Sequence, residues 1–169
     1  MPRKKRKKKI VVAVSGGFDP LHVGHIRLFR EARKLGDMLV VIVNNDHWLR
    51  KKKGIIFMPD KERKELIEAI GGVDKVIISS HSKNPKDMSV SRDLLKLRPT
   101  LFANGGDRDE KDAADPKSSL YKDIQTCKKL GIQIIFNVGK GGKVQSSSWL
   151  LAAYAHHANR KNTKIKKRA

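Results

Sequence analysis

The chain has 169 residues, enough for one domain with a buried core. It carries 38 Lys and Arg against 17 Asp and Glu, a formal net charge of +21, and its single cysteine, Cys127, excludes an internal disulfide framework and fits a reducing compartment. No apolar run approaches the roughly 20 residues of a membrane span or forms a long secretory h-region, so the sequence predicts a cytoplasmic protein without membrane contact.

Much of the positive charge lies at the two ends of the chain. Residues 3–9 carry seven positive charges and residues 160–168 carry six, which leaves +8 for the remainder. We expect residues 1–9 and 159–169 to be disordered basic tails around a domain of residues 10–158. Such tails attract polyanions, which predicts non-specific contact with RNA or DNA. The first run also resembles a nuclear localisation signal, which would predict a nuclear protein if the chain is eukaryotic or viral.

Apolar runs alternate with helical patterns between the tails. This alternation predicts an α/β fold, a Rossmann-like doubly wound sheet of five parallel strands with helices on both faces. Ligands are expected at the carboxyl ends of the strands. In chain order the pattern predicts strand 10–14, helix 24–35, strand 38–43, helix 60–70, strand 76–78, helix 89–97, strand 100–103, helix 117–130, strand 132–136, and a last helix from about 146 through 154.

The segment after the first predicted strand carries the chemistry. It reads Ser-Gly-Gly-Phe-Asp-Pro-Leu-His-Val-Gly-His over residues 15–25, so a glycine turn delivers His22 and His25 to the start of a helix. A spacing of three residues places both imidazoles on one side of the first turn. Gly24 leaves room for a ligand to approach the backbone, and the helix start adds unpaired N–H groups. Together these features predict a polyphosphate site.

Residues 17–25, Gly-Phe-Asp-Pro-Leu-His-Val-Gly-His, resemble the GxFDxxHxGH signature of the cytidylyltransferase-like nucleotidyltransferase superfamily. Glycerol-3-phosphate cytidylyltransferases and heptose-phosphate adenylyltransferases belong to that group, and the similarity extends loosely over residues 10–155. The resemblance implies the HUP type of fold and makes His22 and His25 the transition-state-stabilising residues. It also implies nucleotide contacts from the turn, at Gly16, Gly17, Phe18, Asp19 and Gly24, with Asp19 helping to fix the turn.

The resemblance implies further site residues outside this turn. A lysine is expected after the second strand, and Lys53 or Lys52 fits this position best. We assign Lys53 as a catalytic residue and Lys52 as a nucleotide contact. Lys51 remains a third candidate for the functional lysine. The loop after strand 100–103 offers nucleotide contacts, and Ser146, Ser147 and Ser148 resemble a second signature, although its arginine is absent. Arg63 and Asp46 are the candidates for acceptor binding. The loop candidates are Asn104, Gly105, Asp107 and Arg108.

The resemblance implies transfer of CMP from CTP, or AMP from ATP, to a phosphorylated polyol, sugar or amino alcohol, with release of pyrophosphate. Mg²⁺ is expected to arrive with the nucleotide, without a dedicated protein metal site. Relatives are commonly dimers, so a homodimer is expected. A coenzyme adenylyltransferase of the FAD, NAD or coenzyme A pathway and a non-enzymatic nucleotide- or nucleic-acid-binding protein remain open alternatives. The sequence does not separate ATP from CTP or identify the acceptor, and favours cytidylyl transfer only slightly.

Overall fold

The computed structural model describes residues 8–105, 108, 110–139 and 145–166, with side chains described as far as His156. Its centre is one sheet of five parallel strands in the spatial order β3-β2-β1-β4-β5. The strand order reverses between β1 and β4, which is where a doubly wound sheet opens a crevice for ligands. The strands are β1 (Val11–Gly16), β2 (Met38–Val43), β3 (Lys75–Ile78), β4 (Leu101–Gly105) and β5 (Gln133–Val138).

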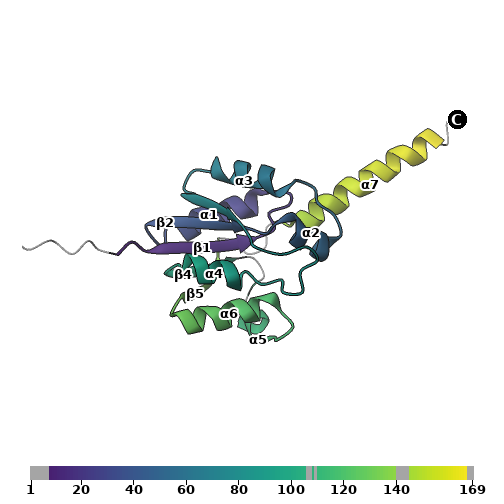
Figure 1. Ribbon diagram of the computed structural model, residues 1–169. Helices are drawn as coiled ribbons and strands as arrows, with labels where there is room; N and C mark the ends of the chain where they lie inside the picture. Colours follow the sequence, from purple (N-terminus) through teal and green to yellow (C-terminus); the bar gives the residue numbers. More distant parts are fainter. Residues whose placement is uncertain (1–7, 106–107, 109, 140–144, 167–169) are drawn as a thin grey trace, which may run out of the picture.

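Seven helices are present in the described residues, and those beside the sheet cover its two faces (Figure 1). On one face, strand residues such as Val12 and Val41 pack with Phe29 of α1 and Ile67 of α3. On the other face, Phe102 packs with residues of α4 and α6. The helices are α1 (Val23–Arg33), α2 (Asp46–Lys53), α3 (Asp60–Glu68), α4 (Ser91–Leu97), α5 (Glu110–Ala114), α6 (Ser119–Leu130) and α7 (Ser147–Lys166).

The predicted α/β class and five-stranded parallel sheet are confirmed. Two short helices, α2 and α5, were not predicted, because their sequences are dominated by charged residues and show no long apolar face. The last helix, α7, projects from the body and continues to Lys166, past the boundary expected at residue 158 (Figure 1). None of the described helices combines the length and apolar character that a bilayer crossing requires.

Candidate active site

A cavity of about 330 Å³ opens at the carboxyl edge of the sheet. Its wall is built largely from residues at the ends of the strands, as the strand order requires. The cavity therefore lies at the edge of the sheet where the sequence predicted that ligands would bind. The strand-end residues in the wall include Gly16 from β1 and Gly17 directly after it, Asn44 after β2, Asn104 and Gly105 from β4, and Gly139 after β5.

The glycine turn after β1 is closely packed. A Cβ on Gly16 would lie 2.9 Å from the ring of Phe18, and one on Gly17 would lie 3.0 Å from the Leu49 side chain of α2. Phe18 is buried, takes a positive φ of 50°, and meets His25 edge-on with ring centroids 5.0 Å apart. The turn therefore lets the backbone line the cavity, while the Phe18 ring packs against His25.

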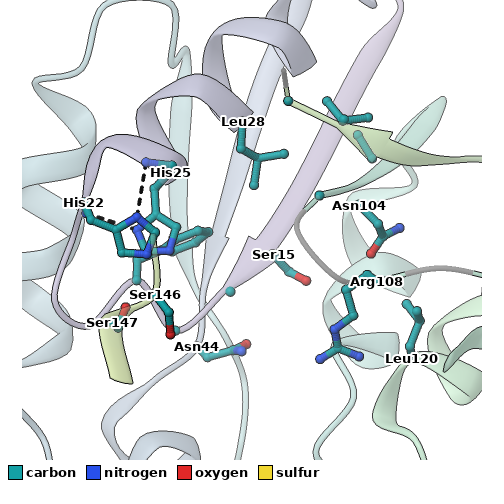
Figure 2. Close-up of a pocket in the computed structure, with 18 of the residues that line it drawn as sticks. Ser15, His22, His25, Leu28, Asn44, Asn104, Arg108, Leu120, Ser146 and Ser147 are labelled. Carbon is teal, nitrogen blue, oxygen red and sulfur yellow. Dashed lines mark hydrogen bonds between the residues drawn. The ribbon is translucent and has the colours of Figure 1, made fainter. Parts of the chain in front are cut away.

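His22 and His25 form a fixed pair at the start of α1 (Figure 2). Nδ1 of His22 accepts the Gly24 N–H at 3.2 Å, and Nδ1 of His25 accepts the His22 N–H at 3.3 Å. Because both Nδ1 atoms are acceptors, each neutral ring carries its proton on Nε2. The rings are stacked, with centroids 3.6 Å apart and planes 24° apart. The result is two adjacent Nε2–H donors beside a helix N-terminus, an arrangement suited to phosphate oxygens.

Burial, with a smaller contribution from nearby positive charge, keeps both imidazoles neutral in the absence of a ligand. Burial lowers the pKa of His25 to about 3, with further lowering from the charges of His22 and Lys53. Burial and then Lys53 also lower the pKa of His22. The pair therefore presents neutral N–H donors, and the anion preference of the site comes from the nearby charge of Lys53 and the start of α1.

The structure distinguishes the three lysines at the end of α2. Lys53 lines the cavity, and its Nζ donates to the carbonyl oxygen of Asp19 at 2.9 Å. Burial lowers the pKa of Lys53; Asp19 opposes this shift and Arg63 adds to it. Lys52 is exposed and away from the cavity wall, and Lys51 donates to Asn84 on the surface. The prediction of Lys52 as a nucleotide contact is thus not supported, because the helical twist turns it to solvent.

The serines at the start of α7 close the same end of the cavity. Ser146, Ser147 and Ser148 all line it, and Ser147 Oγ donates to the Pro20 carbonyl at 2.9 Å. This bond joins the second signature to the histidine turn, although 127 residues separate the two in the chain. Figure 2 shows Ser146 and Ser147 beside the imidazole pair. The two sequence signatures therefore meet at one phosphate-sized site.

The loop after β4 reaches the cavity from the other side. Asn104, Gly105 and Arg108 line it, and a Cβ on Gly105 would lie only 2.6 Å from the Val138 carbonyl oxygen. Arg108 also pairs with Asp112 at 2.9 Å. Asp107, the remaining candidate of this loop, lies outside the described residues.

Comparison with known proteins agrees with this geometry. The family model described as cytidylyltransferase-like matches residues 13–147, which include the histidine turn and the second signature as far as Ser147. The chain belongs to the cytidylyltransferase-like family. It is therefore a nucleotidyltransferase, whose family binds a nucleotide and a small-molecule acceptor.

Curated relatives of this cytidylyltransferase-like protein carry two names. FAD synthase from Pyrococcus horikoshii is 40% identical over 115 residues, 67% of this chain and 73% of that protein. FAD synthase from Thermococcus kodakarensis is 39% identical over 102 residues, 59% of this chain and 68% of that protein. The bifunctional protein HldE of Syntrophotalea carbinolica is 35% identical over 105 residues, which are 61% of this chain but only 20% of HldE.

Solved structures show the same architecture. A lipopolysaccharide core biosynthesis protein from Thermoplasma volcanium superposes with a TM-score of 0.62 at 29% identity, covering 79% of this chain and all of that one. A pantoate-beta-alanine ligase from Francisella tularensis, with a TM-score of 0.52 and 15% identity over 79% of this chain and 60% of that one, shares the fold alone.

Arg63 requires a correction within the cytidylyltransferase-like site. The resemblance implied an acceptor-binding arginine, but Arg63 is completely buried. Its guanidinium donates to the carbonyl oxygens of Gly17 and Asn44, each at 2.7 Å, and its Nε donates to the Met58 carbonyl at 2.8 Å. Its fourth bond is to Asp46 Oδ1 at 2.6 Å. Arg63 therefore ties α3 to the ends of β1 and β2 and does not contact the acceptor.

The roles predicted for two carboxylates, Asp46 and Asp19, also need revision. Asp46 is held by Arg63 and does not line the cavity, so the structure does not support it as an acceptor-binding residue. Asp19 is fully buried, and its two oxygens accept the N–H groups of Phe57 and Met58 at 2.8 and 2.7 Å. It fixes the loop after α2 against the turn, as expected, but makes no wall of the nucleotide cavity.

Sequence reasoning missed part of the cavity wall. Asn44 follows β2 directly, so its position at the carboxyl edge was a usable signal. Trp48 lies on the unpredicted helix α2, is buried, and donates through Nε1 to the Met88 carbonyl at 2.9 Å. Leu120 and Asp123 reach the cavity from α6, where nothing in the local sequence marks them as ligand-binding residues.

The cavity offers one oxygen suited to a magnesium–nucleotide complex. Oδ1 of Asn44 is buried, has no hydrogen-bond partner, and belongs to a residue of the cavity wall. Mg²⁺ in phosphate-transfer sites commonly keeps substrate oxygens and waters and takes few protein ligands, so this amide oxygen fits the ion. Within the described part of the chain, no cluster of three His, Cys, Asp or Glu side chains could hold a metal by itself.

Proposed function

We propose that this nucleotidyltransferase is an adenylyltransferase that joins AMP from ATP to FMN, forming FAD and pyrophosphate. The observation that carries the proposal is the 40% identity to an archaeal FAD synthase over 115 residues, which are 67% of this chain and 73% of that protein. FAD consists of FMN joined to AMP, so its synthesis from FMN requires ATP. The slight sequence preference for cytidylyl transfer therefore gives way to adenylyl transfer.

The reaction needs no covalent enzyme intermediate. A phosphate oxygen of FMN would attack the α-phosphorus of ATP in line, forming the new P–O bond while the bond between the α-phosphorus and the bridging oxygen breaks. The electron pair of that bond leaves with pyrophosphate. The Nε2–H groups of His22 and His25 would donate to the phosphate oxygens as charge grows on them, and Lys53 would add its ammonium charge.

The remaining residues of the phosphate end would position the nucleotide. Ser147 and Ser148 lie at the start of α7 in the cavity wall, and a helix start of this kind would favour the phosphates of the nucleotide. A magnesium ion would neutralise charge on the triphosphate, and Asn44 Oδ1 would hold it to the protein.

A nucleotide-by-acceptor matrix tests the proposal. ATP, CTP, GTP and UTP are each combined with FMN, a heptose phosphate, glycerol 3-phosphate and ethanolamine phosphate, and pyrophosphate release is measured. We expect release above background only for ATP with FMN, with FAD identified by mass. Activity restricted to a sugar phosphate would instead favour the activity suggested by the likeness to HldE, and activity with CTP would refute the base assignment.

A further inference from the structure

The cavity extends beyond the phosphate end into a second region that the proposed mechanism does not use. Figure 2 shows His22 and His25 on one side of Ser15, and Asn104, Arg108 and Leu120 on the other. We call this second region the α6 lobe, since α6 supplies part of its wall. Its other described residues are Met88, Val90, Ser119 and Asp123.

Asp123 is the unusual residue of the α6 lobe. Its side chain is only 5% exposed, yet no Lys, Arg or His among the described residues lies within ion-pair distance of the carboxylate. The carboxylate accepts hydrogen bonds from Ser91 Oγ, at 3.2 Å, and from the backbone N–H of Val90. Burial raises the pKa of Asp123 to about 7; the hydrogen bonds and the more distant charge of Arg108 oppose this shift, and the charge of Asp87 adds to it. A buried carboxyl without a cation is costly, and such groups occur disproportionately where a ligand binds.

Asn104 provides an unpaired polar group in the same lobe. It stands near the end of β4, is 8% exposed, and its Nδ2 is buried without a hydrogen-bond partner. A buried amide nitrogen left unpaired costs free energy that a ligand carbonyl could recover.

Apart from Ser119 and Arg108, the remaining residues of the α6 lobe are apolar. Leu120 lies one turn before Asp123 on α6, so the two share a face of the helix, and Met88 and Val90 add apolar surface from the segment before α4. An apolar wall with a carboxyl and an unpaired amide suits a flat ring that carries alternating carbonyl and N–H groups on one edge.

We propose that the α6 lobe binds the isoalloxazine ring of the flavin acceptor, with Asp123 and Asn104 as the residues that recognise its polar edge. This inference rests on the proposed function. The pyrimidine edge of that ring presents two carbonyls on either side of an N–H. Asn104 Nδ2 donates to a carbonyl, Asp123 accepts from the N–H, and Leu120 packs on the ring face. The FMN phosphate then points toward His22 and His25.

The test compares Asp123→Leu and Asp123→Asn with the wild-type chain. Flavin fluorescence quenching gives the Kd for FMN, and steady-state FAD formation gives the KM for ATP. Loss of a buried hydrogen-bond acceptor, which leaves the ring N–H unpaired, predicts an FMN Kd raised about tenfold in Asp123→Leu, with a smaller rise in Asp123→Asn, which keeps an acceptor oxygen. The KM for ATP stays at its wild-type value.

Lys122→Gln is the matched control, because Lys122 is the neighbouring residue on α6 and forms a surface pair with Asp87 outside this cavity. Circular dichroism checks that Asp123→Leu is folded, and Asp123→Asn supplies the comparison if it is not. An unchanged FMN Kd in both variants, or a raised KM for ATP instead, overturns the inference while leaving the proposed function standing. A wild-type chain that neither binds FMN nor forms FAD refutes the proposed function itself.

Discussion

At the scale of single residues, the histidine turn works through hydrogen bonds that its own backbone supplies. His22 and His25 each use Nδ1 to accept a backbone N–H, so their orientation and tautomer are set before any ligand arrives. Catalytic donors fixed in this way need little rearrangement during the reaction, which is the condition for effective electrostatic stabilisation.

Replacing His25 by alanine tests the importance of this pair. We expect kcat for pyrophosphate release to fall on the order of 10²–10³-fold, since one preorganised donor to the transition state is lost. His47→Ala is the control, because His47 is exposed on α2 and lies outside the cavity wall. Near-normal turnover of a folded His25→Ala chain would refute the catalytic assignment.

The low pKa of His25 predicts a protonation change on nucleotide binding. In the free chain this imidazole is neutral above about pH 3, because burial disfavours its charged form. A bound triphosphate favours the imidazolium and raises that pKa, so the complex holds more protons than the free chain at pH 5–6. We expect proton uptake in calorimetric titrations with ATP in buffers of different ionisation enthalpy, and a smaller uptake for His25→Ala. Proton release at pH 5–6 would contradict this sign.

At the scale of helices and strands, the strongly patterned elements were predictable and the short charged ones were not. The strands near 38–43 and 132–136 are apolar runs whose type follows from composition, and they appear close to the expected residues. Helix α2 consists of Asp-His-Trp-Leu-Arg-Lys-Lys-Lys, which is dominated by charge, so its helical phase could not be assigned. Without that phase, Lys52 and Lys53 were equivalent candidates.

The same limit explains the site residues that were missed. The histidines and serines could be found because each sits in a short segment with its own chemistry. Asp123 could not be found in this way, because it reaches the cavity only through the packing of α6 against α4 and the sheet. Arg63 was placed wrongly for the opposite reason: an arginine at the start of a charged helix gives no local sign that it will be enclosed.

The phase of α2 provides a direct test. Lys53→Ala removes an ammonium group from the cavity wall, and we expect kcat/KM for ATP to fall by on the order of 10²-fold. Lys52→Ala changes a solvent-exposed side chain one residue earlier and should leave this value unaltered. Equal losses in the two variants, measured by pyrophosphate release, would mean that α2 does not present Lys53 to the nucleotide.

At the scale of the whole molecule, the charge distribution separates two kinds of anion binding. The excess of positive charge is concentrated toward the ends of the sequence, whereas the catalytic cavity depends on a few oriented donors. Long-range attraction by many lysines is weakened by salt, while short contacts in a half-enclosed cavity are weakened much less.

Deleting residues 1–8 should therefore separate the two properties. The deletion removes six Lys and Arg residues, and we expect RNA retention in a filter-binding assay to weaken and its dependence on salt to become shallower. Nucleotidyl transfer should proceed at the rate of the full chain. A collapse of transfer in the shortened protein would show that the first residues contribute to catalysis.

The enclosed guanidinium of Arg63 has a consequence for heat resistance. The Arg63 side chain donates to the backbone of the turn after β1 and thereby also anchors its own helix, α3, to that turn. Loss of the partners of a buried charge of this kind lowers the free energy of unfolding by about 3–5 kcal/mol, which is a large part of the stability of a small domain. Thermal inactivation should therefore coincide with the calorimetric melting transition, and an enzyme that lost turnover many degrees below its Tm would show that the site loosens independently of the fold.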